Sequence, residues 1–330
     1  MESGFGRPHT SGTSAASPPQ IAMTTELDRR GFITSCAGAS LAAAIGAVPA
    51  AAKGPAMPSK RNVRKALKYG MIGPGDTVLE KFSLIKELGF DGVEPDAPSG
   101  LDKDELLSAM DKTGIIIPGV VDSVHWAKPF SHPDPNVRAE GRRGLEQAIR
   151  DCKRLRGTSV LVVPAVVNAS VSYDAAYERS QEEIRKVLPM AEDLRIRLLM
   201  ENVWNNFLLS PLEAARYTDE FDSEWVGWHF DIGNIVAYGW PEQWIRILGH
   251  RIHKIDAKEY SREKMNREGK GKGFAVNLLE GDCGWPKVMA ALDEIGYTAK
   301  DEAWMTAEVS GGDADRLRDI SERMDRIAAS

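Results

Sequence analysis

The chain has 330 residues, of which 42% are hydrophobic and 27% are charged, and its formal net charge is −6. This ordinary globular composition is long enough for one large α/β barrel or two smaller domains. The mild acidity gives no electrostatic reason to expect a nucleic acid or an anionic membrane as a partner, and the three cysteines show no metal-binding spacing.

The first part of the chain differs in composition from the rest. Residues 1–25 are rich in Ser, Thr, Pro and Gly, which predicts a disordered N-terminus. Residues 26–52 carry paired Arg29 and Arg30 ahead of an Ala-rich apolar run, which is typical of a twin-arginine export signal. The run is too weakly apolar for a stable membrane span. We therefore expect an exported, periplasmic protein; the alternative is a disordered tail on a cytoplasmic one.

From residue 60 onward, strand-like and helix-like segments alternate, which predicts a single domain over 60–330. Eight such pairs without a long linker favour a closed (β/α)8 TIM barrel over a doubly wound sheet, and no GxGxxG motif opens the first pair. The expected strands are 68–72, 92–96, 116–122, 159–167, 197–203, 226–233, 252–260 and 303–309. The expected helices are 76–88, 102–113, 135–156, 174–194, 211–220, 241–249, 284–295 and 313–328, with Asp102 and Asp313 at N-cap positions.

Acidic residues occur near the ends of four consecutive expected strands. In a TIM barrel the carboxyl ends of the strands form the face that carries the chemistry. A lone carboxylate in such an apolar segment would be costly, whereas several carboxylates around a divalent cation act as its ligands. The sequence therefore predicts a metal site at the barrel mouth, formed by Glu201, Asp231, Asp256 and Glu308.

Four motifs resemble those of the xylose-isomerase-like TIM barrels known as sugar phosphate isomerases and epimerases. That group includes hexulose-phosphate isomerases, pentulose-phosphate 3-epimerases and ketose 3-epimerases. The resemblance extends over residues 66–328, and the motifs occur in the expected order. They are ENVWNNFLLSPLEAARY (201–217), FDIGN (230–234), RIHKIDAKEYSR (251–262) and TAEVSGGD (306–313).

The resemblance implies a divalent cofactor, Mn²⁺, Mg²⁺ or Co²⁺, held by Glu201, Asp231, a residue of the seventh strand and Glu308. Relatives usually carry histidine in the seventh strand, where this sequence has Asp256. The alternative ligand, His253, lies three residues earlier and should point to the other face of the strand. An all-oxygen ligand set would favour Mg²⁺ or Mn²⁺ over Zn²⁺.

The resemblance also implies proton transfer beside a carbonyl through an enediolate, with Glu201 and Glu308 as the acid/base pair. The substrate would be a ketose, a sugar phosphate or a related polyol, and a homodimer or homotetramer is expected. Two alternatives remain: a lyase of the inosose-dehydratase type on the same site, and a non-catalytic carbohydrate-binding barrel. The residues expected to bind the sugar are Asn202, Asn234, Lys258, His125, Glu94 and Trp126.

Overall fold

The computed structural model of the protein describes residues 61–330. The two N-terminal predictions, a disordered segment over 1–25 and an export signal over 26–52, lie outside the described residues. None of the helices that the structure describes is both long and apolar enough to cross a membrane.

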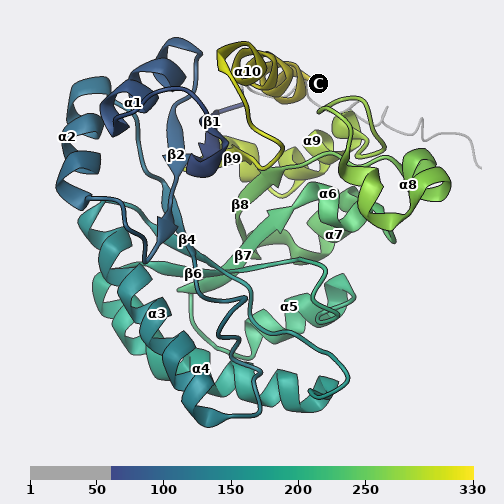
Figure 1. Ribbon diagram of the computed structural model, residues 1–330. Helices are drawn as coiled ribbons and strands as arrows, with labels where there is room; N and C mark the ends of the chain where they lie inside the picture. The colour runs from purple at the N-terminus through teal and green to yellow at the C-terminus, as the bar shows by residue number, and fades with distance from the viewer. Residues whose placement is uncertain (1–60) are drawn as a thin grey trace, which may run out of the picture. The chain divides into compact units, whose positions relative to one another are not determined.

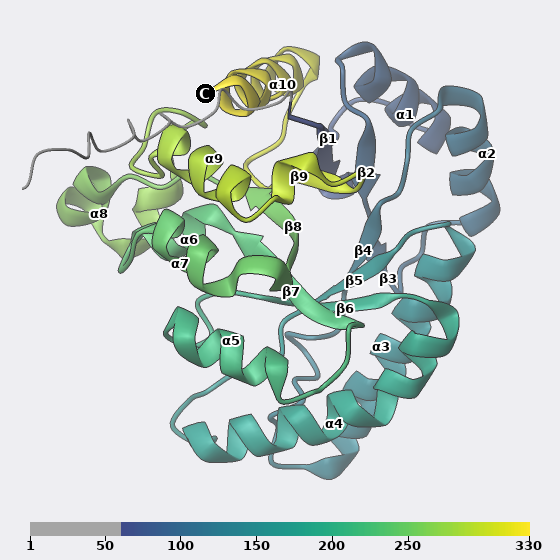
Figure 2. The same ribbon diagram turned by 180° about the vertical axis from the view of Figure 1, so that it is seen from behind.

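The strands form one parallel sheet that curves into a barrel, with the helices around it (Figures 1 and 2). The sheet order is β2-β1-β9-β8-β7-β6-β5-β4-β3, so paired strands follow one another in sequence, except that β1 pairs with β9 and that β2 and β3 do not pair with each other. This architecture confirms the predicted TIM barrel. The strands are β1 (Val63–Lys68), β2 (Gly92–Glu94), β3 (Asp96–Ala97), β4 (Gly119–Asp122), β5 (Ser159–Val162), β6 (Arg197–Glu201), β7 (Val226–Asp231), β8 (Ile252–Ala257) and β9 (Ala303–Ala307).

β2 and β3 together occupy one position in the barrel, because Pro95 between them has no amide hydrogen to donate. β2 pairs with β1, and β3 pairs with β4. Two further bonds close the barrel, from Val93 N to Ile116 O at 2.9 Å and from Val121 N to Pro95 O at 3.0 Å. The nine strands therefore fill the eight positions of a TIM barrel.

The helices cover the outside of the barrel, and two of them begin at the caps that the sequence predicted. The side chain of Asp102 accepts from two amides of α2, and that of Asp313 accepts from Arg316 N. α1 begins with a capping box between Thr77 and Glu80. The helices are α1 (Val78–Glu87), α2 (Lys103–Thr113), α3 (Pro135–Arg154), α4 (Tyr173–Leu194), α5 (Pro211–Asp219), α6 (Ile232–Val236), α7 (Pro241–Leu248), α8 (Arg262–Glu268), α9 (Trp285–Glu294) and α10 (Ala314–Ala329).

The prediction for the first strand was wrong. It placed the strand at 68–72, whereas β1 is Val63–Lys68 and the residues Tyr69–Met71 form a short 3-10 turn. Three basic residues in the segment VRKALK hid its strand character, because a buried strand is expected to be apolar. Lys68 is therefore the last residue of its strand, at the carboxyl end of the barrel, and not the first.

Candidate active site at the carboxyl end of the barrel

Four carboxylates meet at the carboxyl ends of β6 to β9, and we call this group the acid ring: Glu201, Asp231, Asp256 and Glu308. Parallel pairing brings the strand ends to one edge, and the register sets Asp231 beside Asp256. One carboxylate oxygen from each residue lies within 4.8 Å of the other three. Asp231 and Asp256 are fully buried, while Glu308 is partly exposed. The structure thus brings together the four residues that the sequence singled out as ligands.

The acid ring fits a divalent cation. Asp231 Oδ2 and Asp256 Oδ2 are buried, and apart from the ammonium groups of Lys258 and Lys68 neither has a hydrogen-bond partner among the described residues. Oxygen atoms of this kind, converging from four strands, are the ligands that Mg²⁺ and Mn²⁺ prefer. Five carboxylates and three ammonium groups lie in and next to the acid ring, and this excess of two negative charges equals the charge of one such ion. The carboxylates are Glu94, Glu201, Asp231, Asp256 and Glu308, and the ammonium groups are Lys68, Lys254 and Lys258.

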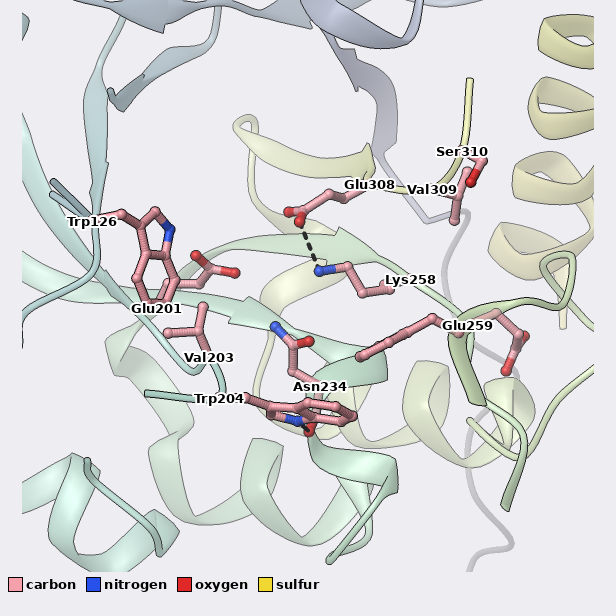
Figure 3. Close-up of a pocket in the computed structure, with 11 residues that line it drawn as sticks. Trp126, Glu201, Val203, Trp204, Asn234, Lys258, Glu259, Glu308, Val309 and Ser310 are labelled. Atoms are coloured by element: carbon pink, nitrogen blue, oxygen red, sulfur yellow. Dashed lines mark hydrogen bonds and ion pairs between the residues drawn. The ribbon is translucent and has the colours of Figure 1, made fainter. Parts of the chain in front are cut away.

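Lys258, which the sequence nominated for substrate binding, lies inside the acid ring. Its Nζ is 2.7 Å from Asp231 Oδ2 and 2.7 Å from Glu308 Oε1 (Figure 3). Burial by itself would lower the pKa of this ammonium group, but the two carboxylates raise it above its ordinary value. Lys258 is therefore a charged neighbour of two ring members.

Lys68 is a second cation at the ring, and the sequence interpretation missed it. Its Nζ lies 2.9 Å from Glu94 Oε2 and 3.1 Å from Asp256 Oδ2. Glu94 also faces Lys254, with 3.2 Å between Oε1 and Nζ. Placing the first strand at 68–72 put Lys68 at the wrong end of the barrel; a strand over 63–68 would have placed it at the mouth.

His229 was also missed, although a period-two reading of β7 would have found it. It lies two residues before Asp231 and so faces the same side of the strand. Its Nε2 is 2.9 Å from Asp256 Oδ1, and the ring is fully buried. This contact orients the Asp256 carboxylate so that Oδ1 faces the His229 imidazole and Oδ2 faces the acid ring. The alternative ligand His253 lies elsewhere, in a cavity at the amino end of the barrel.

The surroundings shift the pKa values of the ring carboxylates in different directions. Burial, reinforced by the charge of Glu308, raises the pKa of Glu201 well above its ordinary value. Burial also raises the pKa of Asp231 and of Glu308, against the opposing effect of Lys258. Burial would raise the pKa of Asp256 too, but His229 and Lys68 hold it below its ordinary value. Glu201, Asp231 and Glu308 are thus the ring members whose pKa is raised, and Asp256 is the one whose pKa is lowered.

A cavity of about 550 Å³ opens above the acid ring (Figure 3). Aromatic side chains, Trp126, Trp204 and Phe274, form part of its wall, and Trp126 is half exposed. Aromatic faces of this kind stack on the apolar faces of sugar rings. The polar residues that line the cavity are Glu201, Asn234, Lys258, Glu259, Glu308 and Ser310.

A smaller cavity of about 270 Å³ shares Trp126, Glu201 and Glu308 with the first. Glu94 and His125, which the sequence nominated for sugar binding, line it, so both lie near the acid ring. His125 Nδ1 accepts from Val163 N at 3.3 Å, and burial lowers the pKa of His125 to about 4. Its imidazole is therefore neutral at pH 7.

The prediction that Asn202 binds substrate is not supported by its contacts. Its Oδ1 accepts from Asp231 N and from Trp228 Nε1, both at 3.0 Å, and its Nδ2 donates to Asp231 O at 2.7 Å. These bonds join the end of β6 to the end of β7. Asn202 is thus a positioning residue that fixes the backbone on which Asp231 stands.

Glu259 lines the cavity but also has a structural role. Its carboxylate accepts from Leu279 N at 2.7 Å, from Trp285 Nε1 at 2.8 Å and from Cys283 N at 3.2 Å. The side chain points away from the acid ring in Figure 3. Glu259 therefore holds the loop between α8 and α9 against the barrel and is separate from the ring.

Comparison with known proteins agrees with this architecture. Residues 82–329 match the family model described as xylose isomerase-like TIM barrel. The L-ribulose-5-phosphate 3-epimerase UlaE of Salmonella paratyphi C (strain RKS4594) is 27% identical over 277 residues, which cover 76% of this chain and 91% of that protein. UlaE of Escherichia coli O1:K1 / APEC is 28% identical over 183 residues, and the match spans 50% of this chain and 62% of that relative.

Solved structures with the same fold include an L-ribulose 3-epimerase, with a TM-score of 0.66 and 16% identity over 81% of this chain and 95% of that one. The 3-keto-D-glucoside 4-epimerase YcjR from E. coli has a TM-score of 0.64 and 15% identity, and the match covers 82% of this chain and all of that one. At these identities the likeness establishes a common fold.

Proposed function

Because this chain belongs to the xylose isomerase-like TIM barrel family, we propose that it is a divalent-metal-dependent sugar epimerase or isomerase. The observation that carries the proposal is the acid ring, in which four carboxylates from four consecutive strands meet below an aromatic-walled cavity. The similarity to L-ribulose-5-phosphate 3-epimerases over most of their length supports epimerase chemistry. Glu201, Asp231, Asp256 and Glu308 would hold the ion.

The all-oxygen ligand set favours Mg²⁺ or Mn²⁺, with Co²⁺ as a further candidate. When bound, such an ion polarises the substrate carbonyl and so acidifies the neighbouring C–H. Glu201 and Glu308 are the proton-transfer groups of the proposal, because they extend from different strands into one cavity (Figure 3). For a 3-epimerase, one would remove the proton from one face of the carbon and the other would return a proton to the opposite face. Burial raises the pKa values of both glutamates above their ordinary values, which favours the protonated form needed to return a proton.

Asn234, Lys258, His125, Glu94 and Trp126 are the proposed substrate contacts. Lys258 would donate to a sugar oxygen while its ion pair orients Glu308. Trp126 would stack on the ring or carbon chain of the sugar. The two cavities that these residues line are large enough for a monosaccharide and part of a second unit.

The function is tested by incubating the protein with Mn²⁺ and a panel of ketoses in D₂O. Epimerase or isomerase action would place deuterium on carbon next to the carbonyl, as detected by NMR and mass spectrometry. A product lighter by one water would indicate the lyase instead. Binding without exchange for every sugar would indicate a carbohydrate-binding barrel and would overturn the proposal.

We also propose that the substrate carries no phosphate and that the protein is exported. The paired Arg29 and Arg30 before an Ala-rich run support export, and phosphorylated sugars are mainly cytoplasmic. Among the described residues that line the main cavity, Lys258 is the only cation, and it is already paired with carboxylates. Fractionation of the tagged full chain tests export, since the periplasmic form should be shorter by the signal. A preference for a ketose phosphate over the free ketose would contradict the proposal that the substrate carries no phosphate.

A further inference from the structure

A second polar cavity, of about 290 Å³, lies at the opposite end of the barrel, where β5, β6, β8 and β9 begin. We call it the cationic cavity. Arg197 is the first residue of β6, four positions before Glu201, so the two side chains lie on the same face of the strand at opposite ends. Its lining consists of Thr158, Ser159, Arg197, Leu199, His253, Lys254, Lys300, Asp301 and Glu302.

Two cations of this cavity, Arg197 and Lys300, lack the carboxylate partners that the acid ring supplies to its lysines. Arg197 Nε is buried without a hydrogen-bond partner, and no ion pair to Arg197 or Lys300 occurs within residues 61–330. The Arg197 guanidinium lies over the ring of Trp225, 5.3 Å from its centroid, and Lys300 Nζ donates to Ile252 O at 2.9 Å. Asp301 and Glu302 are exposed. Buried charge without a counter-charge is costly, so the cavity is suited to an anion.

The lowered pKa values of His253 and Lys300 agree with a local excess of positive charge in the cavity. Burial, together with the charges of Arg197 and Lys300, lowers the pKa of His253 to about 3. Burial and the charge of Arg197 lower the pKa of Lys300. The whole chain has a formal net charge of −6, so this excess is a feature of the cavity and not of the protein.

We propose that the cationic cavity is a binding site for a phosphate group, either as the free ion or as a phosphate monoester. Arg197 and Lys300 would be the anchors, because Lys254 is already paired with Glu94. A guanidinium with a free edge binds two phosphate oxygens in parallel, and the ammonium group of Lys300 supplies a point charge beside it. The Ser159 hydroxyl lines the same space and offers a further donor, whereas Thr158 Oγ1 donates to Pro118 O at 3.1 Å. The volume accommodates phosphate and the first carbons of an ester.

The proposal is tested by calorimetric titration of the purified full chain in a buffer free of phosphate and sulfate. The two probes are inorganic phosphate and fructose 6-phosphate. Both should bind, and tighter binding of fructose 6-phosphate would identify an ester as the ligand, whereas equal binding would identify the free ion. Arg197→Gln and Lys300→Gln should each weaken binding about tenfold or more, because each removes a charge-assisted bond.

Arg143→Gln is the matched control, since it removes the same charge from an exposed position on α3. It should leave binding of both probes unchanged. Thermal unfolding in chloride buffer checks that the two cavity variants are folded, and phosphate should raise the melting temperature of the wild type more than theirs. No binding to the wild type, or equal binding to the wild type and both cavity variants, would overturn the proposal.

Discussion

The two ends of the barrel carry opposite charge although they are built from the same strands. β6 begins with Arg197 and ends with Glu201, and β8 has Lys254 two residues before Asp256. At the carboxyl end the carboxylates are in excess, and at the amino end the unpaired charged side chains that are partly buried, Arg197 and Lys300, are cations. The contacts of Glu94 with Lys254 and Lys68 lie between the two ends. Interior charge in this barrel is therefore separated along the axis, and each end is suited to a counter-ion of the opposite sign.

The ends also differ in how their charges are compensated. Three ring carboxylates, Asp231, Asp256 and Glu308, have lysine nitrogens at 2.7 to 3.1 Å, whereas Arg197 has no carboxylate partner in the described part of the chain. A change at the carboxyl end should thus affect chemistry and metal binding, and a change at the amino end should leave both intact. Four predictions test this difference.

The largest effect is expected from the proposed proton-transfer groups. Glu201→Gln and Glu308→Gln each remove a base while nearly keeping the shape of the side chain, so turnover should fall by about a thousandfold. The measurement is deuterium exchange into the sugar substrate, with circular dichroism as a check on folding. Glu302→Gln, at the exposed edge of the cationic cavity, is the matched control and should retain full turnover. Wild-type exchange in the Glu201 variant would remove that residue from the proposed chemistry.

The second prediction distinguishes Asp256 from His253, the two candidate metal ligands on β8. Asp256→Asn removes a charged oxygen from the acid ring and should weaken Mn²⁺ binding at least about tenfold. His253→Asn changes only the cationic cavity and should leave Mn²⁺ affinity as in the wild type. Calorimetric titration of Mn²⁺ measures both. The reverse pattern would mean that His253 and not Asp256 contacts the ion.

The third prediction concerns the packing between the two ends. A Cβ on Gly119 would lie 2.5 Å from Lys254 Nζ and 2.6 Å from Ser159 O. Because one of these neighbours is backbone, Gly119→Ala should lower the free energy of unfolding by about 1–3 kcal/mol, as measured in urea. Gly100→Ala is the control, since a Cβ there has no atom within 4 Å. Equal stability of the two variants would show that Lys254 and β5 move apart at little cost.

The smallest effect is expected at Asp122, a buried carboxylate at the end of β4 with no ion-pair partner in residues 61–330. Burial raises its pKa to about 7, so the folded state holds this proton more tightly than the unfolded state. The resulting stability is present below about pH 4 and is lost as the pH rises through 7. Asp122→Asn cannot ionise and should gain about 1 kcal/mol over the wild type between pH 5 and pH 6.

Urea unfolding at the two pH values measures that gain. The informative quantity is how the difference in unfolding free energy between variant and wild type changes with pH. Any effect of the amide group that does not depend on pH contributes equally at both pH values. A difference that stays constant with pH would mean that Asp122 is already ionised in the folded protein at pH 5.

Local patterns in the sequence were sufficient for the fold and for the position of the acidic residues. Alternating strand and helix segments predicted the barrel, and acidic residues at strand ends predicted the ring, because parallel strands bring their carboxyl ends to one edge. Asp102 and Asp313 were recognisable as caps for the same reason, since a cap contacts only its own helix. The first strand was misplaced because its lysines are paired with groups far along the chain, Lys65 with Asp325 and Lys68 with Glu94.

Tertiary structure alone decided which partner each polar side chain has. Asn202 changed from a proposed substrate contact to a support for Asp231, and His229 became the partner of Asp256, through contacts between different strands. The same holds for Arg197 and Lys300, which are more than a hundred residues apart and line one cavity. The sequence by itself determined the face and the end of the barrel on which a side chain lies, because strand geometry is local. Charge compensation depends on distances across the barrel, so only the folded chain specifies it.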